Sequence, residues 1–246
     1  MPWDIWLIFF VLGVLVPWRG YARLRELLAK PHVESRDRLL LYLSTIVFQW
    51  LAASVAAWRA RAHGFTMSEL GLVSLLGSKI AAIAALGAAA LAALQWFNLR
   101  RVGRMTKGSR GQLQALAERI LPKTAGERVP FFVLAATAGI CEEFLYRGFA
   151  MAVFARAGLP VWLVVLASAV LFGLAHVYQG RGGFVSTMIL GVLFGLARIA
   201  WQSLTPVMIW HFAVDVIAGV AGPKYLVSGR GNGSQDRLNE GGYILC

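Results

Sequence analysis

Long apolar runs separated by short polar segments are the main pattern along this chain. Seven such runs of about 16 to 25 residues cover positions 3–18, 39–58, 80–97, 130–154, 161–178, 184–201 and 205–222. A helix needs roughly 20 consecutive apolar residues to cross a hydrocarbon core of about 30 Å, so runs of this length are typical of membrane spans. The pattern therefore predicts an all-α fold, a polytopic bundle of about seven transmembrane helices.

The segment 98–129 has a different period. Its apolar side chains recur at helical spacing, while Gln and charged residues fill the positions between them. The apolar positions are Leu113, Leu116, Ala117, Ile120 and Leu121. This spacing predicts an amphipathic helix that lies in the headgroup region and ends at Pro122.

We divide the chain into three parts on this basis. Residues 1–129 hold the first three spans, basic loops and the interfacial helix, and residues 130–222 form a four-helix membrane core that we expect to be catalytic. Residues 223–246 are rich in Gly, Ser and Asn, so we expect a mobile polar tail.

Composition excludes an ordinary soluble globule, because 58% of the residues are hydrophobic and 15% are charged. The two cysteines, Cys141 within a span and Cys246 at the end of the sequence, offer no disulfide framework.

The net charge of +12 comes from basic residues in the loops rather than from one basic face or arm. We therefore expect contacts with anionic headgroups and no nucleic acid as a partner. Alternate loops and the tail hold 18 Lys and Arg, against 4 in the remaining loops. By the positive-inside rule, this asymmetry predicts an outside N-terminus and a cytoplasmic C-terminus, in what we expect to be the bacterial inner membrane.

The fourth span carries two adjacent carboxylates and an arginine, Glu142, Glu143 and Arg147. A charged residue at the centre of a spanning helix costs roughly 2.5 to 3.5 kcal/mol, so three of them indicate a functional site. Glu143 and Arg147 are four residues apart, the spacing of a helical ion pair. Glu142 points about 100° away around the helix axis, so we expect the ion pair to support the site and Glu142 to act chemically.

Two later spans add further polar side chains. His176 lies in the fifth span, and His211 and Asp215 lie one helical turn apart on one face of the seventh. Each has a structural alternative, such as a buried histidine bonded to a carbonyl or a polar clasp between helices. One shared site is more plausible than three separate polar clasps. These groups suffice to activate a water molecule for attack on an amide carbonyl.

The motifs Glu142-Glu143-x-x-x-Arg147, Phe172-x-x-x-His176 and His211-x-x-x-Asp215, in this order, resemble the CAAX-protease and bacteriocin-processing family. This family of intramembrane endopeptidases includes the type II CAAX prenyl proteases. The resemblance covers residues 130–222 and implies hydrolysis of a peptide near the membrane. It implies that Glu142 is the general base and His176 its partner on the water, while His211 and Asp215 steady the oxyanion.

Asp215 stands where this family has Asn or Asp. An ionised aspartate cannot donate to an oxyanion, so Asp215 is either protonated or orients His211. Zinc is an alternative, with Glu142, His176 and His211 as the candidate metal ligands. No HExxH spacing is present. We favour the scheme without a metal or other cofactor, because a carboxylate and an imidazole can activate water alone.

Three other functions remain open. Buried Glu, His and Asp can form the relay of a proton- or ion-coupled transporter, although the first half of the chain has no second EExxxR motif. A non-catalytic membrane scaffold is a second alternative, and a Cys141 nucleophile is a poorer third. As an endopeptidase, the protein would take a membrane-anchored or membrane-inserted peptide or protein as its substrate.

Overall fold

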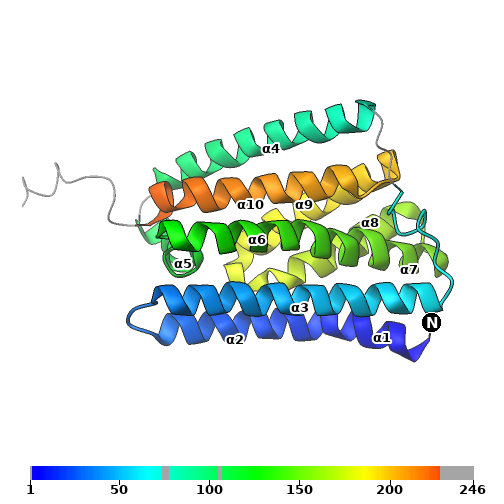
Figure 1. Ribbon diagram of the computed structural model, residues 1–246, viewed down its shortest axis with the longest axis horizontal. Helices are drawn as coiled ribbons and strands as arrows, with labels where there is room; N and C mark the ends of the chain where they lie inside the picture. Colours follow the sequence, from blue (N-terminus) through cyan, green and yellow to red (C-terminus); the bar gives the residue numbers. More distant parts are fainter. Residues whose placement is uncertain (1, 74–77, 105–106, 228–246) are drawn as a thin grey trace, which may run out of the picture.

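The computed structural model describes residues 2–73, 78–104 and 107–227, and within them the chain forms a bundle of helices without strands (Figure 1). In these described ranges, six helical segments are long and apolar enough to cross a membrane, and one further apolar helix is shorter. The six are Trp3–Ala29, Ser35–Ala62, Lys79–Gly103, Ala125–Arg156, Val177–Trp201 and Thr205–Leu226, and the shorter helix is Val161–Ala175. The predicted all-α polytopic bundle is confirmed.

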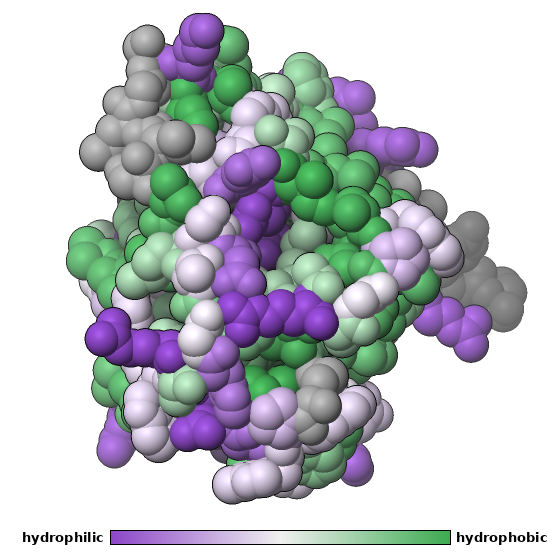
Figure 2. Space-filling model, turned by 90° about the vertical axis from the view of Figure 1, so that its right-hand side faces the viewer, coloured by the Kyte–Doolittle hydropathy of each residue, from purple (hydrophilic) through white to green (hydrophobic). Residues whose placement is uncertain are grey.

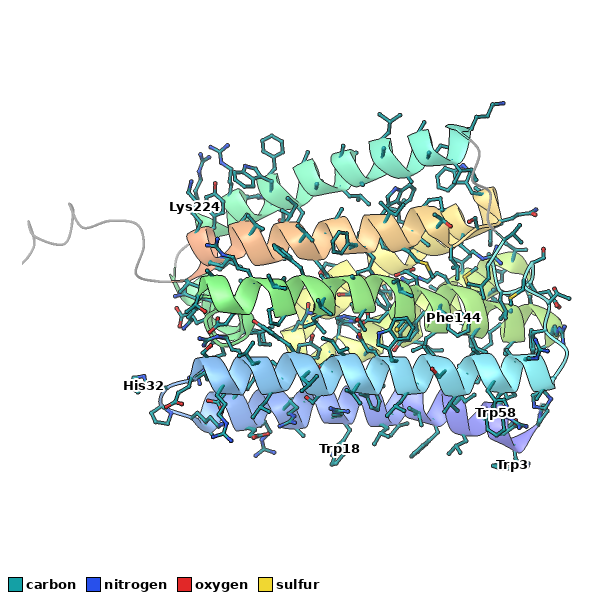
Figure 3. The ribbon with its side chains drawn as sticks, viewed as in Figure 1. Trp3, Trp18, His32, Trp58, Phe144 and Lys224 are labelled. Atoms are coloured by element: carbon teal, nitrogen blue, oxygen red, sulfur yellow. The ribbon has the colours of Figure 1, made fainter. Side chains whose placement is uncertain are left out.

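The first span is longer than the sequence pattern predicted. Helices α1 (Trp3–Phe10) and α2 (Val16–Ala29) are joined by a π-helical turn, η1 (Val11–Leu15), into one continuous helix. The predicted end at residue 18 is wrong, because the helix continues to Ala29 and buries Leu24 and Leu27, while Arg25 and Glu26 remain exposed. Trp18 lies partway along this helix and points away from the bundle (Figure 3).

Helix α3 (Ser35–Ala62) extends beyond the predicted span at both ends and packs against α6 (Ala125–Glu143). It begins with a capping box between Glu34 and Asp37, which satisfies backbone donors of the first turn. Its Arg38 donates two hydrogen bonds, of 2.9 and 2.7 Å, to the buried carboxylate of Glu127. This pair fixes the start of α6 against α3.

Helix α4 (Ser78–Gly103) lies at the edge of the bundle and packs on α10 (Thr205–Leu226), as Figure 1 shows. Trp210 Nε1 donates a hydrogen bond of 3.1 Å to the carbonyl of Ala84. A side chain at Gly87 would occupy the volume of the Trp210 indole. Small residues on α4 therefore permit the close approach of the two helices.

Helix α5 (Lys107–Ile120) occupies the segment in which an amphipathic helix was predicted. Leu116 and Ala117 are buried, as the spacing predicted, whereas the side chain of Leu113 lies outside the described residues. Arg119 donates to the carbonyls of Leu27 and Lys30 at the end of α2, which ties α5 to the first helix.

The catalytic core predicted for residues 130–222 consists of four apolar helical segments. Helix α6, the π-helical turn η2 (Phe144–Ala150) and α7 (Met151–Arg156) form one continuous rod. A turn then leads to α8 (Val161–Ala175), and η3 (Val177–Gln179) leads directly into α9 (Gly180–Trp201) and on to α10.

Two predicted boundaries in this part are wrong. The segment 179–183, predicted to be a loop, contains the first turn of α9, which begins at Gly180 with a φ of 84°. Helix α10 continues through Pro223 to Leu226, so the tail predicted from residue 223 begins after the helix ends. The rest of the predicted mobile tail, residues 228–246, lies outside the described residues.

The connections of the bundle gather at two opposite ends (Figure 1). The α2–α3 turn, α5 and the C-terminal end of α10 lie at one end, which carries the Lys- and Arg-rich segments. The N-terminus, the loop 63–73 and the α7–α8 and α9–α10 turns lie at the other. Figure 2 views this second end, where hydrophilic residues form a band flanked by hydrophobic ones. Successive loops thus alternate between the two ends of the bundle, and the predicted orientation depends on this alternation.

An exposed ion pair lies at the second end of the bundle. Arg156 donates to both carboxylate oxygens of Glu69, at 2.7 and 2.8 Å, and to the carbonyls of His63 and Gly64. The hydrogen bonds from Arg156 lower the pKa of Glu69 to about 2. The loop 63–73 is thereby held against the end of α7.

Candidate active site

Three of the predicted site residues meet inside the bundle although they come from α6, α8 and α10. Glu142 Oε2 lies 4.0 Å from His176 Nε2 and 3.9 Å from His211 Nε2. The three side chains are 9% to 18% exposed, so they are largely but not completely buried. The structure therefore brings the carboxylate and both imidazoles to one point.

Glu142 lies one residue before Glu143, the last residue of α6, which directly precedes the wide turn of η2. Its Oε1 accepts a hydrogen bond of 2.5 Å from Gln49 Nε2 on α3. Its buried Oε2 has no hydrogen-bond partner among the described residues and faces the two histidines. One carboxylate oxygen is thus held in place while the other is directed at the imidazoles.

His176 is placed by the end of α8. It directly follows the last residue of that helix, and its Nδ1 lies 2.9 Å from the carbonyl oxygen of Phe172, one turn back. A carbonyl can only accept, so Nδ1 carries the proton in this hydrogen bond. In the neutral imidazole, Nε2 is then an acceptor directed at Glu142.

His211 is held by a different carboxylate from the one that the sequence suggested. Its Nδ1 donates to Glu143 Oε1 over 2.7 Å, whereas its Nε2 lies 3.6 Å from Asp215 Oδ2. The carboxylate that orients the His211 ring is therefore Glu143, and Asp215 stands beside the free nitrogen, with 33% of its side chain exposed.

Glu143 and Arg147 form the buried pair that their spacing predicted. Arg147 Nη1 donates to Glu143 Oε1 over 3.0 Å, and neither side chain is exposed. The guanidinium carbon lies 4.0 Å from the centre of the Phe172 ring and 5.6 Å from that of Phe194, an arrangement that favours a cation through the ring quadrupoles.

Close packing surrounds this pair. A Cβ built on Gly191 would lie 2.9 Å from the backbone of Ala169 and 3.3 Å from Arg147 Nη2. Gly191 belongs to the Gly-x-x-x-Gly signature of α9, and its missing side chain lets α8 and α9 approach around the guanidinium. Because Glu143 also binds His211, the ion pair, the imidazole and the aromatic rings form one rigid support under Glu142.

A cavity of about 220 Å³ extends from the site between α2 and α3. Glu142, Gln49 and His176 contribute to its wall, together with Tyr178 from η3. Apolar side chains of both helices line most of the remainder. The carboxylate therefore borders an internal cavity of the bundle.

A zinc ion at this cluster would need ligands at tetrahedral spacing. Within the described ranges, no group of three or more His, Cys, Asp or Glu side chains is arranged to hold a metal. Glu142 Oε2 lies 4.0 Å from His176 Nε2 and 3.9 Å from His211 Nε2, whereas two ligands of a tetrahedral zinc lie roughly 3.3 Å apart. The arrangement is wider than a tetrahedral zinc site.

All six predicted site residues lie in one contiguous cluster, but sequence reasoning missed Gln49. Gln49 is the one amide in the second span, whose other polar residues are hydroxyl-bearing, and this is the only sequence feature that distinguishes it. Nothing in the sequence relates position 49 to position 142, because the two lie on separate helices. The contact emerges only from the packing of α3 on α6.

The fold and the site define a multi-pass membrane protein with a shielded carboxylate and two imidazoles beside an internal cavity. Residues 124–217 match the family model described as Type II CAAX prenyl endopeptidase Rce1-like, and this segment contains all six predicted site residues. Over these residues the chain is similar to the CAAX-protease family of intramembrane endopeptidases, and the match supports the assignment that its motifs predicted. No curated protein and no solved structure gives a match.

Replacing Gln49 should lower catalytic activity more than it lowers the stability of the fold. We expect Gln49→Leu to lower kcat about 10- to 100-fold with little change in KM, because a hydrogen bond to a charged group is worth about 1.5 to 3 kcal/mol. Steady-state kinetics and thermal unfolding of the purified variant check this.

Thr45→Val, one turn away on the same wall of the cavity, is the matched control and should keep its activity. Equal kinetics of Gln49→Leu and the native chain would show that the amide does not position Glu142.

Proposed function

We propose that this protein hydrolyses a peptide bond of a membrane-anchored or membrane-inserted substrate, with Glu142 as the general base. The observation that carries this proposal is Oε2 of Glu142, which has no hydrogen-bond partner in the described part of the chain and faces Nε2 of both His176 and His211. A water that donates two hydrogen bonds of about 2.8 Å spans acceptors roughly 4 to 4.5 Å apart. Glu142 Oε2 and His176 Nε2 have a spacing that suits such a water.

The proposed reaction begins when this water attacks the scissile carbonyl carbon and its proton passes to Glu142. His211, held through Nδ1 by Glu143, donates from Nε2 in its imidazolium form to the oxyanion of the tetrahedral intermediate. The carbon–nitrogen bond then breaks, and Glu142 returns the proton to the leaving amine. Asp215 lies 3.6 Å from His211 Nε2, beside the proposed position of the oxyanion.

The experiment that tests the function compares membrane peptides from cells carrying the native chain with those from cells carrying Glu142→Ala. A precursor that accumulates only with the variant names the substrate. If the two peptide populations are identical in cells that express both proteins equally, the proposal fails.

Metal removal separates the two possible ways of activating water. We expect purified protein to contain substoichiometric zinc and to retain its peptidase activity after exhaustive chelation, because Glu142 and His176 suffice as bases. We expect Asp215→Asn to remain active, since an amide beside His211 can donate to the oxyanion. Metal analysis and peptide cleavage assays provide the measurements.

The opposite result would point to a zinc-dependent reaction. Activity that chelation abolishes and zinc restores, together with an Asp215→Asn variant slowed about tenfold or more, would support a zinc held by His176, His211 and Glu142.

We also propose that the basic end of the bundle faces the cytoplasm and that the N-terminus lies outside. Loops at this end carry most of the Lys and Arg residues, as the positive-inside rule requires of cytoplasmic loops. A cysteine placed at Arg101 should react with an impermeant maleimide in opened membranes but not in intact cells. Labelling in intact cells would reverse the orientation.

A further inference from the structure

The imidazole of His176 packs against an aromatic side chain that has no part in the proposed reaction. His176 follows the last residue of α8, and with a φ of −109° it stands outside the regular helix. Its hydrogen bond from Nδ1 to the carbonyl of Phe172 fixes one atom of the ring. A single hydrogen bond leaves the ring able to pivot, so the direction of Nε2 depends on what packs against the imidazole.

Two aromatic rings limit this pivoting. The centre of the Phe172 ring lies 4.7 Å from that of the imidazole, with an interplanar angle of 61°. The centre of the Tyr178 ring lies 6.1 Å away, at 28°. Aromatic rings interact at centre-to-centre distances of about 4.5 to 7 Å. Phe172 belongs to the buried support around Arg147, whereas Tyr178 comes from η3 and lines the cavity.

The position of Tyr178 is set in turn by Gly20 on α2. A Cβ built on Gly20 would lie 2.9 Å from Cδ1 of the tyrosine ring, and 3.5 and 3.6 Å from Cε1 and Cγ. Carbon atoms attract one another best at about 3.5 to 4.0 Å, so any side chain at position 20 would displace the ring. Helix α2 packs on η3 here. The absence of a side chain at Gly20 therefore gives the ring its place.

We propose that Tyr178 is a positioning residue for His176 and that Gly20 of α2 holds the Tyr178 ring in place. This inference rests on the proposed peptidase function, in which Nε2 of His176 and Oε2 of Glu142 bind the attacking water. Displacing the ring would turn Nε2 away from that water without removing any group that reacts. Catalysis then depends on α2, which lies outside the matched segment 124–217.

The kinetic effect should appear in kcat rather than in KM. We expect Tyr178→Leu and Gly20→Ala each to lower kcat about 10- to 100-fold, because small displacements of a reacting group slow a reaction strongly. The first variant removes the ring, and the second displaces it. Tyr178→Phe keeps the ring and loses only the hydroxyl, so it should recover most of the rate that Tyr178→Leu loses. The substrate is the precursor peptide identified in the Glu142→Ala comparison.

Gly13→Ala provides the matched control. Gly13 lies in η1 of the same continuous helix, and a Cβ there would lie 3.3 Å from the side chain of Leu171 on α8. We expect this variant to keep the native kinetics. In the double variant Gly20→Ala/Tyr178→Leu, the two losses should not add, because Gly20 acts through the ring that Tyr178→Leu has already removed.

A chemical probe of His176 tests the positioning without any peptidase activity. Diethyl pyrocarbonate acylates unprotonated imidazole nitrogens, and mass spectrometry of the digested protein gives a rate for each histidine. The full chain in detergent is used for the labelling. We expect faster modification of His176 in Tyr178→Leu and Gly20→Ala, because the covering ring is removed or displaced. His32, exposed in the turn between α2 and α3, is the internal reference (Figure 3).

Three kinetic results would each overturn the inference. These are native kcat in both Tyr178→Leu and Gly20→Ala, an equal loss of activity in Tyr178→Phe, and a change confined to KM. The second would assign the role to the hydroxyl group, and the third would make Tyr178 a contact of the substrate. Unchanged modification of His176 in both variants would also overturn it. Faster modification of His176 in a chain that cleaves no peptide would leave the positioning intact and refute the proposed function.

Discussion

Glu142→Gln is expected to reduce peptide cleavage by about 10² to 10⁴-fold while leaving the yield of folded protein unchanged. The amide has nearly the same size as the carboxylate, and it can still contact Gln49, but it cannot accept the proton of the attacking water. Cleavage assays on purified protein, with thermal unfolding in parallel, measure both quantities. Turnover near the native rate would exclude Glu142 as the base.

Cys141 provides the control for this experiment, because it directly precedes Glu142 and was the alternative nucleophile. Its side chain is fully buried in the main hydrophobic cluster. We expect Cys141→Ala to keep most of the activity. A large loss in Cys141→Ala with retained activity in Glu142→Gln would reverse the assignment.

Arg147→Met is expected to destabilise the protein by about 3 to 5 kcal/mol, the cost of leaving one member of a buried ion pair without its partner. Methionine fills much of the volume of arginine, so the expected loss comes from the charge of Glu143 rather than from a cavity. Unfolding in detergent, followed by tryptophan fluorescence, compares Arg147→Met with Glu142→Gln and the native chain.

The double variant Glu143→Gln/Arg147→Met separates charge from packing. Replacing both members of a buried pair is often nearly neutral, so the double variant should be more stable than Arg147→Met alone. Equal stability of Arg147→Met and Glu142→Gln would contradict the division of roles between the two adjacent acids.

Local spacing explains which parts of the site could be predicted. The pair of Glu143 and Arg147 follows from a separation of four residues, and His211 and Asp215 share a helical face for the same reason. The hydrogen bond from His211 to Glu143 and that from Gln49 to Glu142 join separate helices. Their geometry depends on helix packing, which no spacing in the sequence records.

The errors in the fold also have a physical cause. Charge density after Trp18 indicated a loop, but the helix continues with Arg25 and Glu26 exposed and with Leu24 and Leu27 buried. The length of each apolar run predicted the spans well, because membrane thickness sets that length. The ends of the helices were predicted less well, because they extend beyond the membrane. The two π-helical turns, η1 and η2, had no sequence signal that we recognised.

The short length of helix α8 has a consequence for the surrounding bilayer. Its 15 residues correspond to about 22 Å, less than the roughly 30 Å of a typical hydrocarbon core. His176 directly follows the end of α8, so hydrophobic mismatch should thin the bilayer locally beside it. Water then reaches the histidine across a shortened apolar path, and cleavage in reconstituted vesicles should slow as the acyl chains of the lipids are lengthened.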